Sequence, residues 1–200
     1  MRAILGHAQL PVVALALFFG CKGEPRARVL DESEEDYVGA TGAGAETYDR
    51  LITASVEKLL QKHSAAVQGL DHLKVAYLGV ENQGVEEIGD WQEHLYELID
   101  TSISAAGRYQ SISRRFVEVA LRETRLKPDE LFLPDKRQQF IDILKAQGNP
   151  IECLLFSKIT TGSTQAHEAK QRNYLLTLEL VDLETGYYDK VSERVRKVYK

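Results

Sequence analysis

Three segments with the apolar periodicity of strands follow one another at the end of the chain, with no helical segment between them. They cover residues 151–161, 173–183 and 187–198. Strands in direct succession are joined by hairpins and pair antiparallel. The pattern therefore predicts a sheet that is antiparallel at least in part.

The middle segment is apolar on two faces. Its alternate residues form two sets, Tyr174, Leu176, Leu178 and Leu180 against Leu175, Thr177, Glu179 and Val181. Successive side chains of a strand point to opposite faces, so this strand is half-buried, with a second face that we expect the first helix to cover. Residues 182–186 (DLETG) form a turn signal in which Gly186 accepts a positive φ. Residues 162–172 (GSTQAHEAKQR) predict a long polar hairpin loop.

Helical and strand patterns alternate in the first half of the domain. Residues 46–67 carry an apolar helical stripe, and residues 73–80 form a largely apolar strand, which is typical of a central position. A helix capped near Asp90 then runs to Gly107, and a short strand covers residues 109–112.

Two further helices precede the closing strands. Ser113 is placed to cap the first of them, with Phe116, Val117, Ala120 and Leu121 directed inward. Pro134 stands in the first turn of the second, which ends at Gly148. The order predicts an α+β domain over residues 46–200, with a mixed or antiparallel sheet of four to five strands and helices packed around it.

An apolar run at the start of the chain ends directly before a cysteine. Residues 10–19 are too short to cross a bilayer as a helix, which needs roughly 20 residues, and suit the apolar region of a signal peptide. The run ends in Leu17-Phe18-Phe19-Gly20-Cys21, which resembles a bacterial lipobox. We interpret residues 1–20 as a lipoprotein signal peptide and Cys21 as the lipidated residue. The alternative is that Cys21 is an incidental thiol in a buried helix.

The segment after Cys21 is rich in acids and small residues. Residues 31–36 hold five acids among six positions, and residues 39–45 are Gly, Ala and Thr. Such a composition buries too little apolar surface to remain ordered alone. Residues 21–45 are therefore predicted to be a flexible tether behind the lipid anchor.

The sequence offers no recognisable active site. The net charge of −5 and pI near 5.6 disfavour nucleic acid as a partner. No histidine pair shares a helical face among His63, His72, His94 and His167, and no metal-ligand motif occurs. We expect surface positions for His72 and His167, and Cys153 to be a small buried hydrophobe. These patterns predict no enzyme, cofactor, metal or small-molecule substrate.

Cations gather near the end of the chain. We expect Arg172, Lys190, Arg194 and Arg196, with the loop at 162–172, to form a partner-binding patch. A charged outer strand also discourages edge-to-edge aggregation, and that is the alternative interpretation.

Two stretches resemble a known family. The segment YLLTLELVDLETGYYDKVSERVRK (residues 174–197) is similar to the last hairpin of the LpoB-type penicillin-binding protein activators. The segment LKVAYLGVENQGVEEIGDWQEHLYELIDTSISAAGRYQSISR (residues 73–114) is similar to the first strand, loop, helix and second strand of that family. The resemblance covers most of the chain after Cys21.

The resemblance implies a small sheet with helices around it, like the N-terminal domain of TolB and part of CsgG-type lipoproteins. It implies a lipoprotein anchored in the outer membrane and facing the periplasm, an assignment that Lys22 after the lipidated Cys21 favours. Such a protein binds and allosterically activates a class A penicillin-binding protein in peptidoglycan synthesis. The alternative function is that of a TolB- or CsgG-like structural or assembly lipoprotein of the cell envelope.

Overall fold

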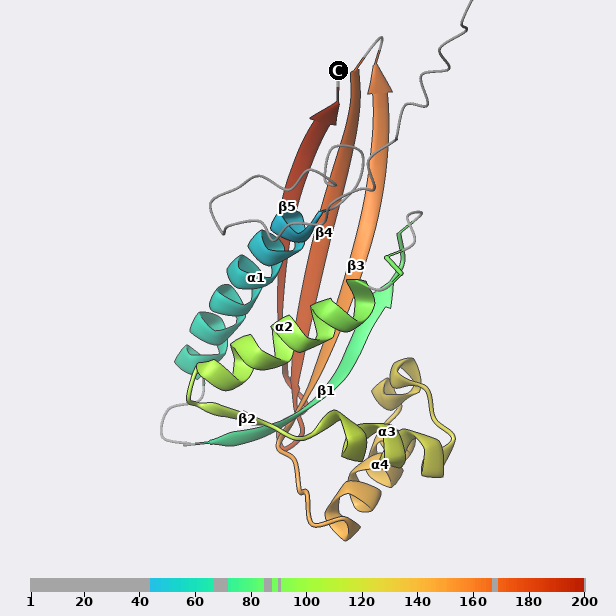
Figure 1. The fold of residues 1–200 in the computed structure, drawn as a ribbon. Coiled ribbons are helices and arrows are strands. Elements are labelled where there is room, and N and C mark those ends of the chain that lie inside the picture. Colours follow the sequence, from blue (N-terminus) through green and yellow to red (C-terminus); the bar gives the residue numbers. More distant parts are fainter. Residues whose placement is uncertain (1–43, 67–71, 85–87, 90, 167–168, 200) are drawn as a thin grey trace, which may run out of the picture. The chain divides into compact units, whose positions relative to one another are not determined.

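Five strands form one mixed sheet in the order β2-β1-β3-β4-β5 (Figure 1). The structure is a computed structural model that describes residues 44–66, 72–84, 88–89, 91–166 and 169–199. Strands β1 (Leu73–Asn82), β2 (Tyr109–Ser111) and β3 (Cys153–Ala166) pair in parallel. Strands β4 (Ala169–Asp182) and β5 (Tyr188–Tyr199) continue the sheet antiparallel. The α+β class, the mixed sheet and the central position of β1 are confirmed.

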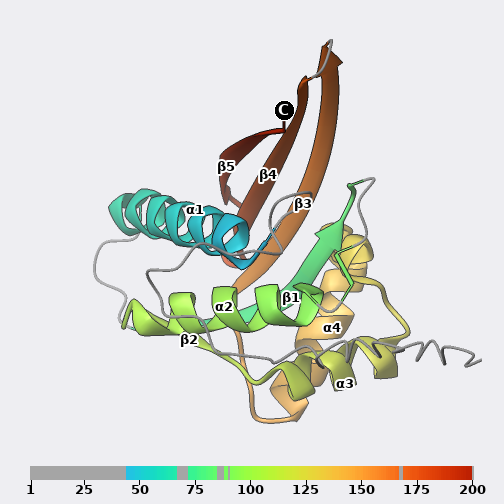
Figure 2. The same cartoon turned by 45° about the horizontal axis from the view of Figure 1, so that its top comes forward.

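Helices pack on both faces of the sheet. Helices α1 (Ala45–Ala66) and α2 (Trp91–Ala105) share a core with one face, as Figure 2 shows. Helix α3 (Arg114–Thr124), the 3₁₀ helix η2 (Pro128–Phe132) and α4 (Pro134–Ala146) share a second core with the other face. The expected signal peptide, Cys21 and almost all of the expected tether lie outside the described residues.

The α1 face holds the larger core. The stripe of α1 buries Leu51, Ile52, Val56 and Leu59 against Tyr174, Leu176, Leu178 and Leu180 of β4. Our expectation that α1 covers the other set of β4 residues is therefore wrong. Val181 of that set packs into the core under α3 and α4 instead, because helices occupy both faces and α1 can cover only one.

The segment at 162–172 is part of the sheet. Strands β3 and β4 pair from Cys153↔Asp182 continuously to Ala166↔Ala169, so the expected long hairpin loop is wrong. The segment adopts strand conformation although its Ser, Thr and Gln side chains do not pack on a core. Residues 162–165 are exposed. The polarity of this segment reflects a pair of strands that no helix covers, and a loop would have the same composition. His167 lies outside the described residues.

The start of α3 differs from expectation in two respects. Ser113 occupies the N-cap position, but its side chain makes no capping hydrogen bond. Phe116 is 41% exposed rather than inward, while Val117 and Ala120 are buried as expected. Leu121 is partly buried against the same core, so α3 packs through Val117, Ala120 and Leu121, and Phe116 lies outside this stripe.

Replacing Leu178 by Ala is expected to lower the free energy of unfolding by about 2–5 kcal/mol, since a fully buried leucine leaves a cavity. Leu178 is 0% exposed and lies in the core between β4 and α1. Leu133→Ala is the matched control, because Leu133 is 53% exposed and exposed substitutions change stability by only about 0.5 kcal/mol. Urea unfolding followed by circular dichroism measures both, and equal losses in the two variants would contradict this core assignment.

Candidate functional site

The cations of β5 share one face of the sheet. Register pairs Lys190 with Glu179, Arg194 with Leu175 and Arg196 with Asn173, and paired residues point to the same side. Lys158 joins this side through its register with Thr177. We call Lys158, Lys190, Arg194 and Arg196 the cationic face, which lies on the side of the sheet opposite α1.

Arg172 does not belong to the cationic face. It follows Gln171 and precedes Asn173 on β4, and it pairs in register with Lys197 on the α1 side of the sheet. The structure therefore brings together three of the four cations that the sequence predicted and places Arg172 on the opposite side. The register between β4 and β5 decides which face each cation occupies, and the sequence alone does not reveal this register.

Charges on β5 are sorted by face. Asp189 and Glu193 turn toward α1, where Asp189 pairs with Lys62 at 3.3 Å and Glu193 pairs with Lys58. On the opposite face, Lys190 contacts Glu179 at 3.3 Å. The acids of β5 thus form ion pairs with lysines of α1. Arg194 and Arg196 face away from this helix and are exposed.

A shallow hollow lies beside the two arginines. It has a volume of about 430 Å³ and is lined by Thr160, Thr161, Gly162, Gln171, Asn173, Leu175, Arg194 and Arg196. Its lining is polar except for Leu175. Such a surface suits hydrogen bonding to a polar or acidic partner.

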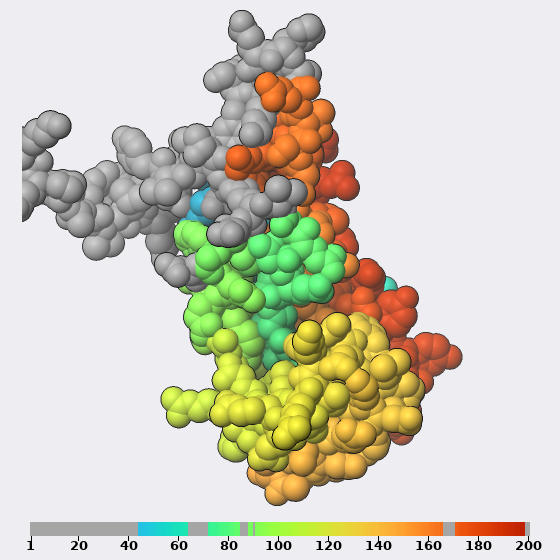
Figure 3. Space-filling view, turned by 90° about the vertical axis from the view of Figure 1, so that its right-hand side faces the viewer, coloured from blue at the N-terminus to red at the C-terminus, as the bar shows by residue number. Residues whose placement is uncertain are grey.

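A larger groove, of about 770 Å³, adjoins the cationic face at Lys158 and Lys190. It lies where β1 meets η2 and the start of α3, and Figure 3 shows these elements, green and yellow, beside the red β5. Strand β1 has a register irregularity between Tyr77 and Val80, and Gly79 there has φ +96°. The bulge requires glycine at this position, since other residues are strained at such a φ.

The bulge is held by a buried hydrogen-bond chain. The Tyr77 hydroxyl lies 2.8 Å from Ser157 Oγ, which donates to the Gly79 carbonyl at 3.0 Å. Burial raises the pKa of Tyr77 well above its ordinary value. The Tyr96 ring stacks on Tyr77 with centroids 4.6 Å apart. The Tyr96 hydroxyl is buried and has no hydrogen-bond partner among the described residues, and Tyr96 lines the groove.

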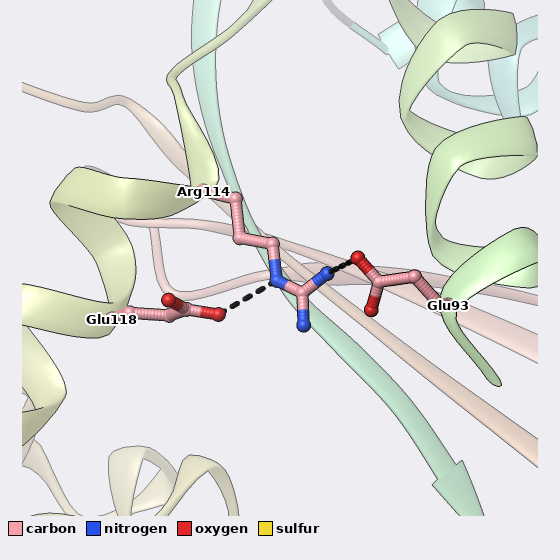
Figure 4. A network of polar contacts seen from close by, with 3 residues as sticks. All are labelled: Glu93, Arg114 and Glu118. Atoms are coloured by element: carbon pink, nitrogen blue, oxygen red, sulfur yellow. Dashed lines mark hydrogen bonds and ion pairs between the residues drawn. The ribbon is translucent and has the colours of Figure 1, made fainter. Parts of the chain in front are cut away.

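Arg114 bridges α2 and α3 at the rim of the groove (Figure 4). Its guanidinium donates to Glu93 of α2 and, at 2.7 Å, to Glu118 of α3. It also lies 4.5 Å from the centre of the Tyr96 ring, a cation–π geometry. The hydrogen bond from Arg114 lowers the pKa of Glu93 below its ordinary value.

Aromatic side chains complete the groove on the η2 side. Phe132 is 51% exposed and stacks on Phe156 of β3 with centroids 4.5 Å apart. The groove thus combines exposed apolar surface with Lys127, Lys158 and Lys190. Exposed aromatic residues are enriched in protein-binding surfaces, and cations beside them can steer an acidic partner. Sequence reasoning missed it because its parts come from β1, α2, α3, η2 and β3.

Side chains of the types that can bind metals come together outside the groove and the cationic face. The described residues contain one cluster of this kind, His63, Cys153 and Asp182, on the α1 side of the sheet. Cys153 is fully buried, as expected. His72 is exposed, as expected.

The structure is an α+β domain built on a mixed five-stranded sheet, and it is similar to solved structures. It is similar to the LpoB C-terminal domain from Salmonella enterica, with 17% identity, a TM-score of 0.50, and coverage of 74% of this chain and 97% of that one. The LpoB C-terminal domain from Escherichia coli gives 16% identity, a TM-score of 0.49 and coverage of 74% and 97%. Lipoprotein GNA1162 from Neisseria meningitidis gives 15% identity and a TM-score of 0.45, with coverage of 63% of this chain and 83% of that one.

The likeness to the Salmonella domain confirms, at the level of the fold, the resemblance that the sequence indicates. No protein family and no curated protein matches the chain by sequence. Among the helices that the structure describes, none combines the length and the apolar character that a membrane span requires.

Arg114→Gln is expected to return the pKa of Glu93 toward its ordinary value of 4.5, because the hydrogen bond that lowers it is lost. A lowered carboxyl pKa contributes stability above pH 4.5 that disappears as the pH falls through the folded-state pKa. The variant should therefore show a weaker loss of stability on acidification. Side-chain NMR titration measures the pKa directly.

The control for this experiment is Glu130, whose pKa is lowered mainly by a hydrogen bond from Lys136 and next by the Lys127 backbone. It lies in a separate ion pair and should titrate identically in both proteins. An unchanged Glu93 pKa in Arg114→Gln would show that the bridge between α2 and α3 is absent in solution.

Proposed function

We propose that the protein is a lipid-anchored periplasmic regulator that binds a class A penicillin-binding protein and activates it allosterically in peptidoglycan synthesis. The observation that carries this proposal is the fold shared with the Salmonella LpoB C-terminal domain. The lipobox-like sequence ending at Cys21 and the acidic segment behind it support the proposal independently.

The cationic face is proposed as the docking surface. Arg194 and Arg196 are exposed, and the ion pairs of Asp189 and Glu193 with α1 leave this side of β5 with cations outward. The adjoining groove adds the exposed Phe132 ring. An acidic partner surface with an apolar projection fits both parts, because charge steers encounter and apolar contact supplies affinity.

Activation would follow from differential binding. A regulator shifts an enzyme toward its active conformation only as far as it binds that conformation more tightly. Anchoring in the same compartment raises the effective concentration of the docking surface around the synthase. The protein needs no catalytic group of its own for this mechanism.

The proposed anchor is a lipidated Cys21 in the outer membrane. Each buried methylene contributes about 0.8 kcal/mol, so that one acyl chain binds reversibly and two or three chains together hold stably. Lys22, which follows the cysteine, supports outer-membrane sorting.

Cys21→Ser is expected to abolish incorporation of a palmitate analogue and to move the protein from the membrane fraction to the soluble fraction. Metabolic labelling and fractionation measure both. Cys153→Ser is the control, because the Cys153 thiol is fully buried in the domain. Labelling that persists in Cys21→Ser would exclude Cys21 as the anchor.

The chain is expected to stimulate glycan polymerisation or crosslinking by the purified class A synthase of the same organism, with saturable binding. Arg194→Glu/Arg196→Glu should weaken this binding by about tenfold or more, since each reversal places a like charge against an acidic surface. Arg172→Glu/Lys197→Glu makes the same charge change at a register pair on the opposite side of the sheet and should leave affinity near that of the wild type.

Two outcomes of the same experiment would contradict the proposal. Absence of binding and stimulation would refute activation, and stable self-association would then favour the structural or assembly function. Stimulation with equal affinity in all variants would retain activation and move the docking surface away from the cationic face.

A further inference from the structure

The fold brings three metal-ligating side chains together at one end of the sheet. His63 lies in the last turn of α1, Cys153 begins β3, and Asp182 ends β4 as its register partner. Their ligand atoms all lie within 4.8 Å of one another. His63 is 3% exposed and Cys153 is 0% exposed. The cluster is separate from the cationic face, which lies on the other side of the sheet.

Neighbouring groups orient two of the three side chains. The Tyr109 hydroxyl lies 2.5 Å from His63 Nδ1. Asp182 Oδ1 accepts hydrogen bonds from the backbone N–H groups of Glu184, at 3.0 Å, and Thr185, at 2.7 Å. The Thr185 hydroxyl donates to the same oxygen at 2.8 Å. Contacts of this kind fix ligand orientation around protein-bound metals.

The donor set selects the class of metal. One imidazole nitrogen, one sulfur and one carboxylate oxygen are the ligands of Zn²⁺ in proteins, whereas Mg²⁺ and Ca²⁺ prefer oxygen alone. When the Nδ1 proton of His63 is donated to Tyr109, Nε2 keeps the lone pair that a metal requires.

We propose that His63, Cys153 and Asp182 bind one Zn²⁺ ion, with a small exchangeable ligand such as water in the fourth position. Bonds of about 2.0–2.3 Å place tetrahedral ligand atoms roughly 3.3–3.8 Å apart. To bind the ion, ligand atoms that now lie up to 4.8 Å apart must approach one another by about 1 Å, which side-chain rotation can provide. The bound ion joins the end of α1 to the ends of β3 and β4, and stabilises the folded domain because the unfolded chain lacks the assembled site.

The test uses the full chain in detergent with Cys21→Ser, so that Cys153 is the single remaining thiol. The chain is stripped with chelator and titrated with Co²⁺, a spectroscopic probe for Zn²⁺ sites. We expect a thiolate-to-Co²⁺ charge-transfer band that saturates at one ion per chain. Zn²⁺ should abolish the band and raise Tm, while Mg²⁺ should do neither.

Three variants assign the ligands. Cys153→Ser should remove the band, and His63→Gln and Asp182→Asn should each weaken Co²⁺ binding by tenfold or more. Asp182→Asn keeps a side-chain oxygen for the turn at Glu184 and Thr185. His94→Gln is the matched control, because His94 is exposed, and it should bind as the parent chain does. Circular dichroism of the metal-free variants checks folding.

The parent chain alone can overturn the proposal. A folded Cys21→Ser chain without a charge-transfer band at millimolar Co²⁺ excludes the site, whatever the variants do. A band that survives unchanged in folded His63→Gln and Asp182→Asn would show adventitious thiol binding and would also reject it. Neither result bears on activation of the synthase, so the two proposals fail separately.

Discussion

The antiparallel ladder between β3 and β4 determines where the other parts of the molecule lie. It runs without a register shift from Cys153↔Asp182 to Ala166↔Ala169. Because side chains alternate along it, each strand contributes residues to two cores. One set packs against α1 and α2, and the other packs against α3 and α4. The same ladder sets Cys153 beside Asp182 at one end and carries the uncovered polar pairs at the other.

Strand β5 pairs with β4 of this ladder, and its acidic and basic residues alternate, so that they lie on opposite faces of the sheet. Asp189 and Glu193 face α1, and Lys58 and Lys62 of that helix neutralise them. Lys190, Arg194 and Arg196 occupy the alternate positions. A shift of register by one residue would bring the cations under the helix and expose the acids. The ion pairs with α1 thus help to specify which charges reach the solvent.

Sequence periodicity predicted much of the fold and less of the site. The stripe of α1, the central β1 and the alternation in β4 are strong patterns, because each reflects burial on a defined face. The polar strands at 162–172 lack such a pattern, since no core covers them, and their sequence therefore predicts a loop. Apolarity predicts a core position for Phe116 but does not show that α3 packs through Val117, Ala120 and Leu121, which leaves Phe116 exposed.

The site required information that no single segment holds. The separation of Arg172 from Arg194 follows from register, and the groove depends on a bulge at Gly79 meeting η2. His63, Cys153 and Asp182 lie far apart in the chain and meet only through the packing of α1 on the sheet. Spacing rules detect ligands that share a helix or a turn, and these three share neither.

The β3 and β4 strands extend past the helices, as Figure 1 shows. The paired residues there, from Gly162↔Asn173 onward, are joined by backbone hydrogen bonds while residues 162–165 stay exposed. Opening this end of the ladder exposes little apolar surface, so its free energy is small compared with that of global unfolding. A partner that contacts the arginines beside it would restrict this opening. The loss of conformational entropy would then reduce the binding affinity. A stiffer ladder end would lose less entropy and bind more tightly.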